Sequence, residues 1–134
     1  MDYKKWMNHT FTSYPDTGKD YLVFQKDIRA DLKKQANLYN FDLHSFNKNH
    51  YCFSAVLKDR DSGRFIYVSM NDVRGMREEL FNCILYRTMK HDKDWTGGYN
   101  NWCCWQELGK KCRELVEWTQ RHEKINEIEE ELER

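Results

Sequence analysis

The fold of this protein is decided by residues 50–70, which read HYCFSAVLKDRDSGRFIYVSM. Apolar and polar or small side chains alternate over residues 50–58, and residues 64–70 are rich in β-branched and aromatic types. Such segments are typical of strands with one face toward a core. The intervening residues 59–63 have the composition of a hairpin loop, and Gly63 suits a positive φ. The stretch therefore predicts an antiparallel β-hairpin.

A helix is predicted on each side of this hairpin. Residues 20–39 repeat apolar side chains at intervals of three and four, as one face of a helix does, and Asn40 suits the C-terminal end. The same periodicity returns at about Cys104 and continues to the end of the chain. A helix of about thirty residues spans roughly 45 Å, which exceeds the width of a small domain. Its last turns are therefore expected to project.

Residues 43–46 and 80–89 predict two further strands. We therefore expect an α+β fold in the order helix, three- to four-stranded antiparallel sheet, long C-terminal helix, with both helices on one sheet face. The expected organisation is a single domain. Residues 1–19 are its lead-in, residues 20–122 its α+β core, and residues 123–134 a projecting acidic helix end.

The composition fits one folded domain and excludes several protein classes. A chain of 134 residues with 22 basic and 22 acidic side chains is too short for most multi-domain enzymes. One proline, six glycines and 15% aromatic residues exclude a disordered chain. The sequence starts without an apolar signal segment and nowhere approaches the roughly 18 apolar residues of a membrane span. We expect a cytoplasmic protein.

The five cysteines are odd in number and irregularly spaced, which predicts free thiols in a reducing compartment. Cys103, Cys104, Cys112 and His122 lack the paired spacing of structural zinc ligands. Cys103 or Cys104, at a helix start with His91 upstream, matches no cysteine-hydrolase signature. The sequence therefore predicts no metal, no cofactor and no catalytic residue.

The strongest functional signal is in residues 92–102, DKDWTGGYNNW. Tyrosine and tryptophan are enriched at interface hot spots, and glycine and asparagine adapt to a partner surface. One interpretation is a loop that recognises a protein partner. The other is that Trp95 and Trp102 anchor the loop against the sheet while Asn100 or Asn101 caps the last helix. The residues predicted to bind a partner are Asp92, Asp94, Trp95, Tyr99 and Asn101.

The C-terminal end carries a second signal. Residues 123–134 contain six glutamates against one lysine and one arginine, a local charge of −4, so the remaining residues sum to +4. A solvated helix end is one explanation. The other is a partner for its apolar side chains, either a second copy in a coiled-coil dimer or a basic groove on another protein. One stripe on this helix consists of Glu123, Glu127 and Glu131. We predict that these three glutamates bind the partner.

Two other function classes compete with a protein-binding role. Helix, three strands, helix is also the order of double-stranded RNA-binding domains, although here an extra strand and a long loop precede the last helix. The nucleic-acid contacts predicted on this view are Lys90, Lys93, Lys110 and Lys111. The third class is a small metal-dependent hydrolase that uses His91, Asp92 and Asp94.

Two segments, YVSMNDVR at residues 67–74 and ILYRTMKHDKDWTGG at residues 84–98, resemble small uncharacterised proteins of phages and mobile elements in Gram-positive bacteria. Proteins of such elements include anti-CRISPR and other anti-defence inhibitors, which commonly occupy a nuclease or nucleic-acid-binding surface. The resemblance implies a non-enzymatic inhibitor whose protein partner is a host defence nuclease. It carries over no catalytic residue.

Overall fold

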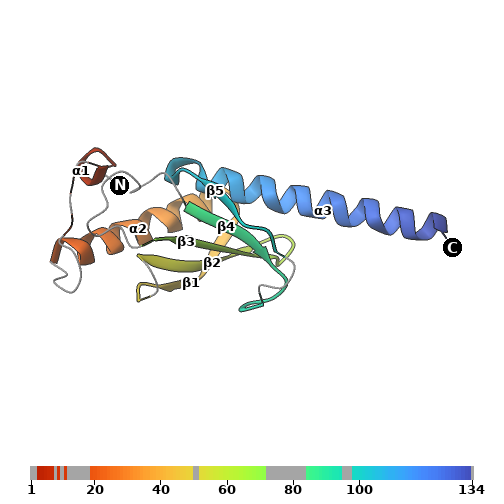
Figure 1. Cartoon of the computed structure of the whole chain (residues 1–134), viewed down its shortest axis with the longest axis horizontal. Coiled ribbons are helices and arrows are strands. Elements are labelled where there is room, and N and C mark those ends of the chain that lie inside the picture. The colour runs from red at the N-terminus through yellow and green to blue at the C-terminus, as the bar shows by residue number, and fades with distance from the viewer. Residues whose placement is uncertain are drawn as a thin grey trace.

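The computed structural model describes residues 3–7, 9, 11, 19–49, 52–71, 84–94 and 98–133. Along the chain, the elements are α1 (Tyr3–Met7), α2 (Lys19–Leu38), β1 (Phe41–Asn47), β2 (Phe53–Asp59), β3 (Phe65–Met70), β4 (Ile84–Met89), β5 (Asn101–Cys103), a 3-10 turn (Trp105–Glu107) and α3 (Leu108–Glu133) (Figure 1). The predicted α+β order is confirmed.

The strands form one antiparallel sheet in the order β1-β2-β3-β4-β5, so each strand pairs with its neighbour in sequence. The expected number of three to four strands was too low, because five are present among the described residues. The strand that was missed is β5 (Asn101–Cys103), whose first two residues lie inside residues 92–102, the segment predicted to be a loop. A strand this short has no readable alternation and depends on pairing with β4.

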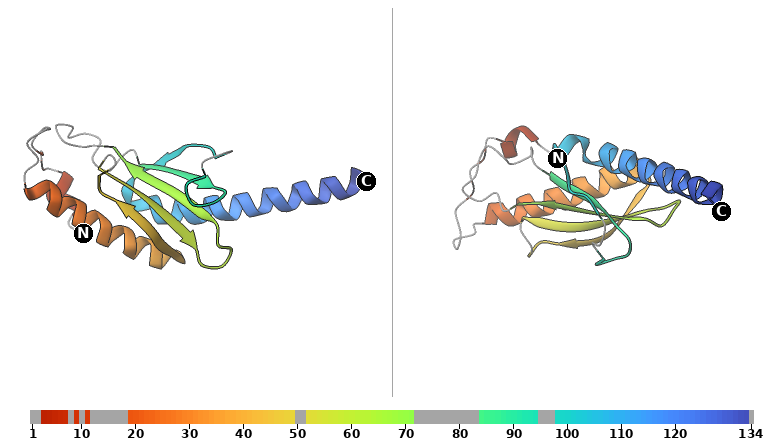
Figure 2. Two further views of the ribbon diagram at one scale, coloured as in Figure 1. Left: turned by 90° about the horizontal axis from the view of Figure 1, so that it is seen from below. Right: turned by 45° about the vertical axis from the view of Figure 1, so that its right-hand side comes forward.

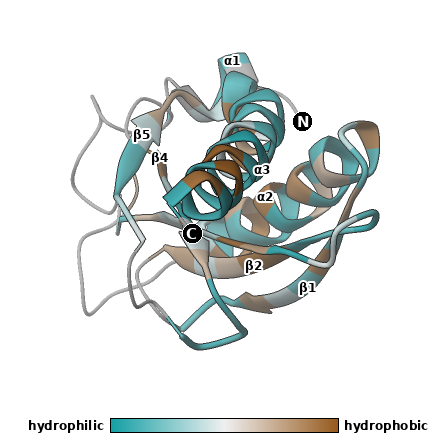
Figure 3. Ribbon diagram, turned by 90° about the vertical axis from the view of Figure 1, so that its right-hand side faces the viewer, coloured by the Kyte–Doolittle hydropathy of each residue, from teal (hydrophilic) through white to brown (hydrophobic). Residues whose placement is uncertain are grey.

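Both long helices cover the same face of the sheet, as predicted (Figures 1 and 3). The side chains of β2 and β3 that point toward the helices are almost fully buried. These residues are Phe53, Ala55, Leu57, Ile66, Val68 and Met70. They pack against the inner face of α2, where Phe24, Ile28 and Leu32 have no exposed surface. Every second side chain of the strands faces the helix, and the helix side chains at intervals of three and four face the strands. Together these side chains form the core.

The β2–β3 hairpin is formed as predicted. Phe53 pairs with Met70 and Lys58 with Phe65, and Gly63 has a φ of 74°. The Gly63 amide donates to the Asp59 carbonyl at 2.8 Å, which closes the turn. Residues 50–51 of the first predicted strand and 80–83 of the last lie outside the described residues.

The N-terminal segment predicted to be a lead-in, residues 1–19, contributes a buried side chain. Trp6 of α1 is almost fully buried, with its ring centroid 5.1 Å from that of Phe24 in α2. Its indole N–H donates to Asp27 of α2 at 3.0 Å. Residues 12–18, which include the only proline, lie outside the described residues.

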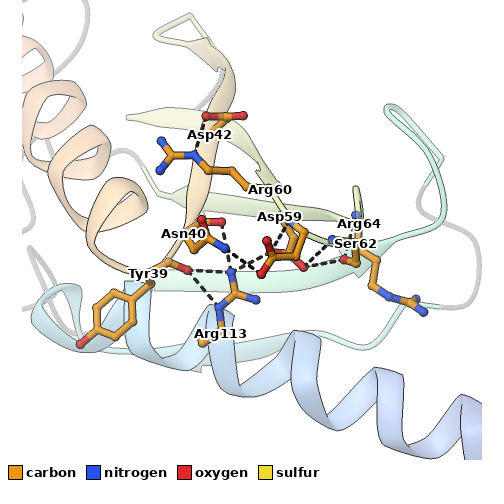
Figure 4. Close-up of polar contacts among 9 residues, drawn as sticks. Tyr39, Asn40, Asp42, Asp59, Arg60, Ser62, Arg64 and Arg113 are labelled. Atoms are coloured by element: carbon orange, nitrogen blue, oxygen red, sulfur yellow. Dashed lines mark hydrogen bonds and ion pairs between the residues drawn. The ribbon is translucent and has the colours of Figure 1, made fainter.

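Arg113 of α3 joins four parts of the fold (Figure 4). Its guanidinium donates to the Tyr39 carbonyl at the end of α2, from Nε at 3.0 Å and from Nη2 at 2.7 Å. Nη2 also lies 2.7 Å from Asp59 Oδ1, at the end of β2. The guanidinium lies 4.4 Å from the centre of the Phe41 ring at the start of β1. One side chain thus satisfies the C-terminal carbonyl of α2 and a buried carboxylate.

A second polar link sets the crossing of α2 and α3. The Gln35 side chain of α2 donates to the Trp105 carbonyl at 2.9 Å and accepts from the Gly109 amide at 2.9 Å. A Cβ on Gly109 would lie 2.7 Å from the Tyr39 ring and 3.2 Å from the Gln35 carbonyl oxygen. The absence of a side chain at Gly109 therefore allows the two helices to approach this closely.

The outer half of α3 leaves the sheet and extends away from it (Figures 1 and 2). Among the described residues, the hydrogen-bonded contact farthest along the helix is an ion pair in which both terminal nitrogens of Arg64, beside the β2–β3 turn, bind the Glu123 carboxylate. Side chains from Glu123 onward are exposed.

Replacing Arg113 by methionine should lower the free energy of unfolding by about 3 kcal/mol, because it leaves the buried Asp59 carboxylate without its cation. Urea unfolding followed by circular dichroism measures this change. Arg121→Met is the matched control, since Arg121 is exposed on the same helix, and it should change stability by no more than about 0.5 kcal/mol. Equal effects of the two variants would contradict the role assigned to Arg113.

Stability should also depend on the ionisation of Asp59. Burial raises the pKa of this carboxyl, but hydrogen bonds from Arg113 and Ser62 outweigh it and hold the pKa below its ordinary value. A depressed pKa in the folded state stabilises the protein above the unfolded pKa, about 3.9, and that contribution is lost as pH falls through the folded value. Asp59→Asn should therefore show a smaller loss of stability below about pH 4 than the unaltered protein in urea titrations. Glu127→Gln, at an exposed carboxyl, should leave the acid limb unchanged.

Candidate interaction groove

A groove of about 590 Å³ opens where α3 lifts away from β4 and β5. The sheet contributes Tyr86 and Asn101, and Tyr99 comes from the segment just before β5. The helix contributes Lys111, Leu115 and Trp118, which follow one another at intervals of four and three. This spacing places them on one side of α3. The groove therefore combines the paired residues Tyr86 and Asn101 of β4 and β5 with one helical stripe.

Trp118 is held in position but remains accessible. Its ring stacks on His122, with the ring centroids 3.7 Å apart and an interplanar angle of 26°. His122 Nδ1 lies 3.0 Å from the Trp118 carbonyl oxygen, one turn back along α3. Trp118 nevertheless keeps 48% of its surface exposed, although Val116 two residues earlier is fully buried. The side chains of α3 therefore change from buried at Val116 to half exposed at Trp118 within one turn.

Tyr99 is held in position through its backbone. Arg87 of β4 donates to the Gly98 carbonyl at 2.9 Å and to Asn100 Oδ1 at 3.2 Å. A Cβ on Gly98 would lie 2.5 Å from the Thr88 carbonyl oxygen, so only glycine allows this close approach. The ring of Tyr99 is 80% exposed. The hairpin therefore fixes the backbone and presents the aromatic ring to solvent.

The interpretation that the aromatic loop anchors itself is not supported at the residues described. Trp102 points to the sheet face opposite the helices, because its neighbours in β5 face inward, and it is 60% exposed. Neither asparagine caps α3: Asn100 accepts from Arg87, and Asn101 donates to the Tyr99 carbonyl. The capping prediction was wrong. Trp95 lies outside the described residues.

The acidic residues predicted to bind a partner lie apart from the groove. Asp92 and Asp94 belong to a tight turn in which the Lys90 amide donates to the Asp94 carbonyl at 3.2 Å. Asp92 Oδ2 lies 3.1 Å from His44 Nε2 of β1, so this turn reaches across the sheet toward its far edge. The remaining predicted residues are all on α3: Glu123, paired with Arg64, and Glu127 and Glu131, exposed beyond it.

The lysines predicted to contact nucleic acid are dispersed. Lys111 lies in the groove, 3.6 Å from Glu114, while Lys110 is exposed beside it in sequence. Lys90 lines a separate cavity of about 400 Å³ between the ends of β3 and β4 and α3. Lys93 lines a third cavity, of about 330 Å³, on β1 to β3. The structure does not join these four side chains into one surface.

The cysteines behave as core residues. Cys52, Cys103, Cys104 and Cys112 are free, as predicted, and Cys83 lies outside the described residues. Burial raises the pKa of Cys103 to about 12 and the pKa of Cys112 well above its ordinary value. Cys103 pairs with Ile84 at the start of β4, whereas His91 follows the end of that strand. A thiolate activated by His91 is therefore not formed at Cys103.

A metal-dependent site is likewise not assembled in the part of the chain that is described. No group of three or more histidine, cysteine or acidic side chains there could hold a metal ion. None of the described helices is long and apolar enough to cross a membrane. In comparisons with known protein families, curated proteins and solved structures, nothing matched this chain.

Sequence reasoning did not find Trp118 and Leu115 as site residues. Both fit the apolar periodicity of the last helix, and that pattern does not distinguish a core position from one just beyond the edge of the sheet. The available signal was the length of the helix. It predicts that the helix extends beyond the domain, but it does not predict the turn at which the helix leaves the sheet.

Alkylation of the native protein should distinguish the described cysteines. Cys104 is half-buried, whereas Cys52, Cys103 and Cys112 are buried. Because the thiolate is the reactive form and burial disfavours it, iodoacetamide at neutral pH should label Cys104 first, as read by peptide mass spectrometry. In urea, all of them should react at similar rates. Fast native labelling of Cys103 would contradict its burial and raised pKa.

Proposed function

We propose that this chain is a non-enzymatic binding protein, and that its groove takes a segment of a protein partner. The observation that carries the proposal is the pair of exposed aromatic residues that line the groove, Tyr99 and Trp118. Tyrosine and tryptophan supply large contact areas at low entropic cost and dominate interface hot spots. Their backbone supports are rigid, so little ordering is required on binding.

The shape of the site also favours a peptide or loop as its occupant. Among the described residues, β5 pairs with β4 alone, so its outer edge is the end of the described sheet. An extended segment can add to such an edge through main-chain hydrogen bonds, and its side chains then enter adjacent pockets. The groove rim carries Lys111, Glu114 and Arg121, so it has both signs of charge. Mixed charge fits a polar protein rim better than a polyanion.

The class of partner follows from the resemblance to phage and mobile-element proteins in residues 67–74 and 84–98. On that basis, we propose an anti-defence inhibitor of the anti-CRISPR kind whose partner is a host defence nuclease. Nucleic-acid binding through the lysines predicted from the sequence is the second candidate, and its support is limited to the order of elements. The dispersion of Lys90, Lys93 and Lys110 weighs against it, because phosphate contacts need a continuous cationic surface.

The test begins with capture of partners by the tagged full chain from nuclease-treated bacterial lysate, followed by titration of the captured protein. Tyr99→Ala and Trp118→Ala should each weaken binding by about tenfold or more, as hot-spot truncations do. Leu38→Ala, at an exposed apolar residue at the end of α2, is the matched control and should leave affinity unchanged. Thermal melting should be unaltered in all three variants.

Two outcomes would reject the proposal. If both groove variants bound the captured protein as tightly as the unaltered chain, the groove would not be the binding site. If the lysate yielded only nucleic acid, lost on nuclease treatment and bound with a steep salt dependence, the second candidate would replace the first.

A further inference from the structure

The acidic residues of α2 turn toward the body of the protein. Asp27 accepts from the Trp6 indole at 3.0 Å, and Asp31 accepts from the Trp105 indole at 2.6 Å. Asp20 Oδ2 lies 2.5 Å from His9 Nε2. These carboxylates are thus engaged on the inner side and flanks of the helix, where they bind rings from three other segments.

The basic residues of α2 are all exposed. Lys26, Arg29 and Lys33 follow one another at intervals of three and four and therefore lie along one side of the helix. Lys48 faces them from the turn after β1, across a cavity of about 630 Å³. We call these four residues the cationic face of α2.

The cationic face has apolar surface within it. Leu22, one turn before Lys26, lines the same cavity and is 53% exposed. The ring of Phe46 forms part of the wall, with the Arg29 guanidinium 6.0 Å from its centroid. A ligand for this surface would carry negative charge together with apolar groups, because both kinds of surface are available side by side.

The outer end of α3 has the complementary chemistry. Residues 124–133, the acidic tail, hold five glutamates and one lysine. Its apolar side chains are also exposed, with Ile125 and Ile128 half exposed and Leu132 81% exposed. Glu127, Glu130 and Glu133 follow at intervals of three, close to the spacing of the basic residues on α2.

These two surfaces cannot meet within one chain. The N-terminal half of α2 lies at the opposite end of the molecule from the end of α3, and α3 is one continuous helix that leads away from the sheet (Figure 1). Pairing two acidic tails would bring like charges together along the contact, which is unfavourable at low salt. Among the described residues, the cationic face of α2 gathers basic side chains whose charge is opposite to that of the tail.

We propose that the acidic tail of one copy docks on the cationic face of α2 in a second copy. Glutamates of the tail pair with Lys26, Arg29 and Lys33, while Ile128 and Leu132 cover Leu22 and the cavity wall. Each copy then offers one tail and one face, so two copies can exchange tails in a closed pair, or successive copies can join head to tail. This contact uses none of the side chains that line the groove of the proposed function.

Sedimentation equilibrium of the full chain tests the proposal. At low salt, the average mass should rise with protein concentration above that of the monomer. Raising the salt from about 0.01 M to about 1 M shortens the Debye length from about 30 Å to about 3 Å, and it should shift the protein toward monomer. A chain that stays monomeric at low salt and high concentration would overturn the proposal.

Charge reversal identifies the two surfaces. A face variant (Lys26→Glu, Arg29→Glu, Lys33→Glu) and a tail variant (Glu127→Lys, Glu130→Lys, Glu133→Lys) should each be monomeric alone and should associate when mixed. All six positions are exposed, and circular dichroism melting checks that each variant is folded. Failure of the mixture to associate, or a face variant that still self-associates through its tails, would overturn the proposal.

The same variants test whether this face binds nucleic acid instead of the acidic tail. Fluorescence anisotropy with a labelled single-stranded oligonucleotide should show no difference between the face variant and the unaltered chain. Tight binding that the face variant loses, in a protein that stays monomeric, would assign the face to nucleic acid and overturn self-assembly.

Discussion

The contact on which the rest of the structure depends is the one between Arg113 and Asp59. A carboxylate buried at the end of β2 needs a cation, and the guanidinium that meets it also satisfies the last carbonyls of α2. Asn40, with a φ of 66°, ends that helix and turns the chain into β1 at the same point. The end of α2, the β2–β3 turn and α3 are therefore held by one planar group, whose geometry suits several acceptors.

The anchoring of α3 explains where both proposed binding surfaces lie. Its first turns are fixed by Gln35 at the crossing with α2, and its middle by Arg113 and by the pair between Arg64 and Glu123. After that pair the helix has no sheet beneath it. The groove lies along the flank where the helix separates from β4 and β5, and the acidic tail lies beyond. One long helix therefore supplies a wall for one surface and the whole of the other.

The net charge of the chain is zero, but the fold places basic and acidic side chains on separate surfaces. On α2 the acidic side chains are engaged by Trp6, Trp105 and His9, which leaves a cationic exterior. On α3 the glutamates gather beyond the last tertiary contact. Interfaces commonly use such complementarity to select partners and to speed association. In this chain it accompanies a separate aromatic groove, so the two proposed binding surfaces share no side chains.

The sequence by itself determined the α+β class, the β2–β3 hairpin with Gly63, the helix that ends at Asn40 and the long final helix, because these follow from local periodicity and turn chemistry. The composition of residues 92–102 also drew attention to Tyr99 and Asn101, which line the candidate groove. Only the tertiary structure decided that β5 is a strand, that Trp118 joins Tyr99 in one groove, and that Asp92 and Glu123 are engaged elsewhere. Those outcomes depend on contacts between residues far apart in the chain, such as Arg64 with Glu123, and no local pattern encodes where two elements meet.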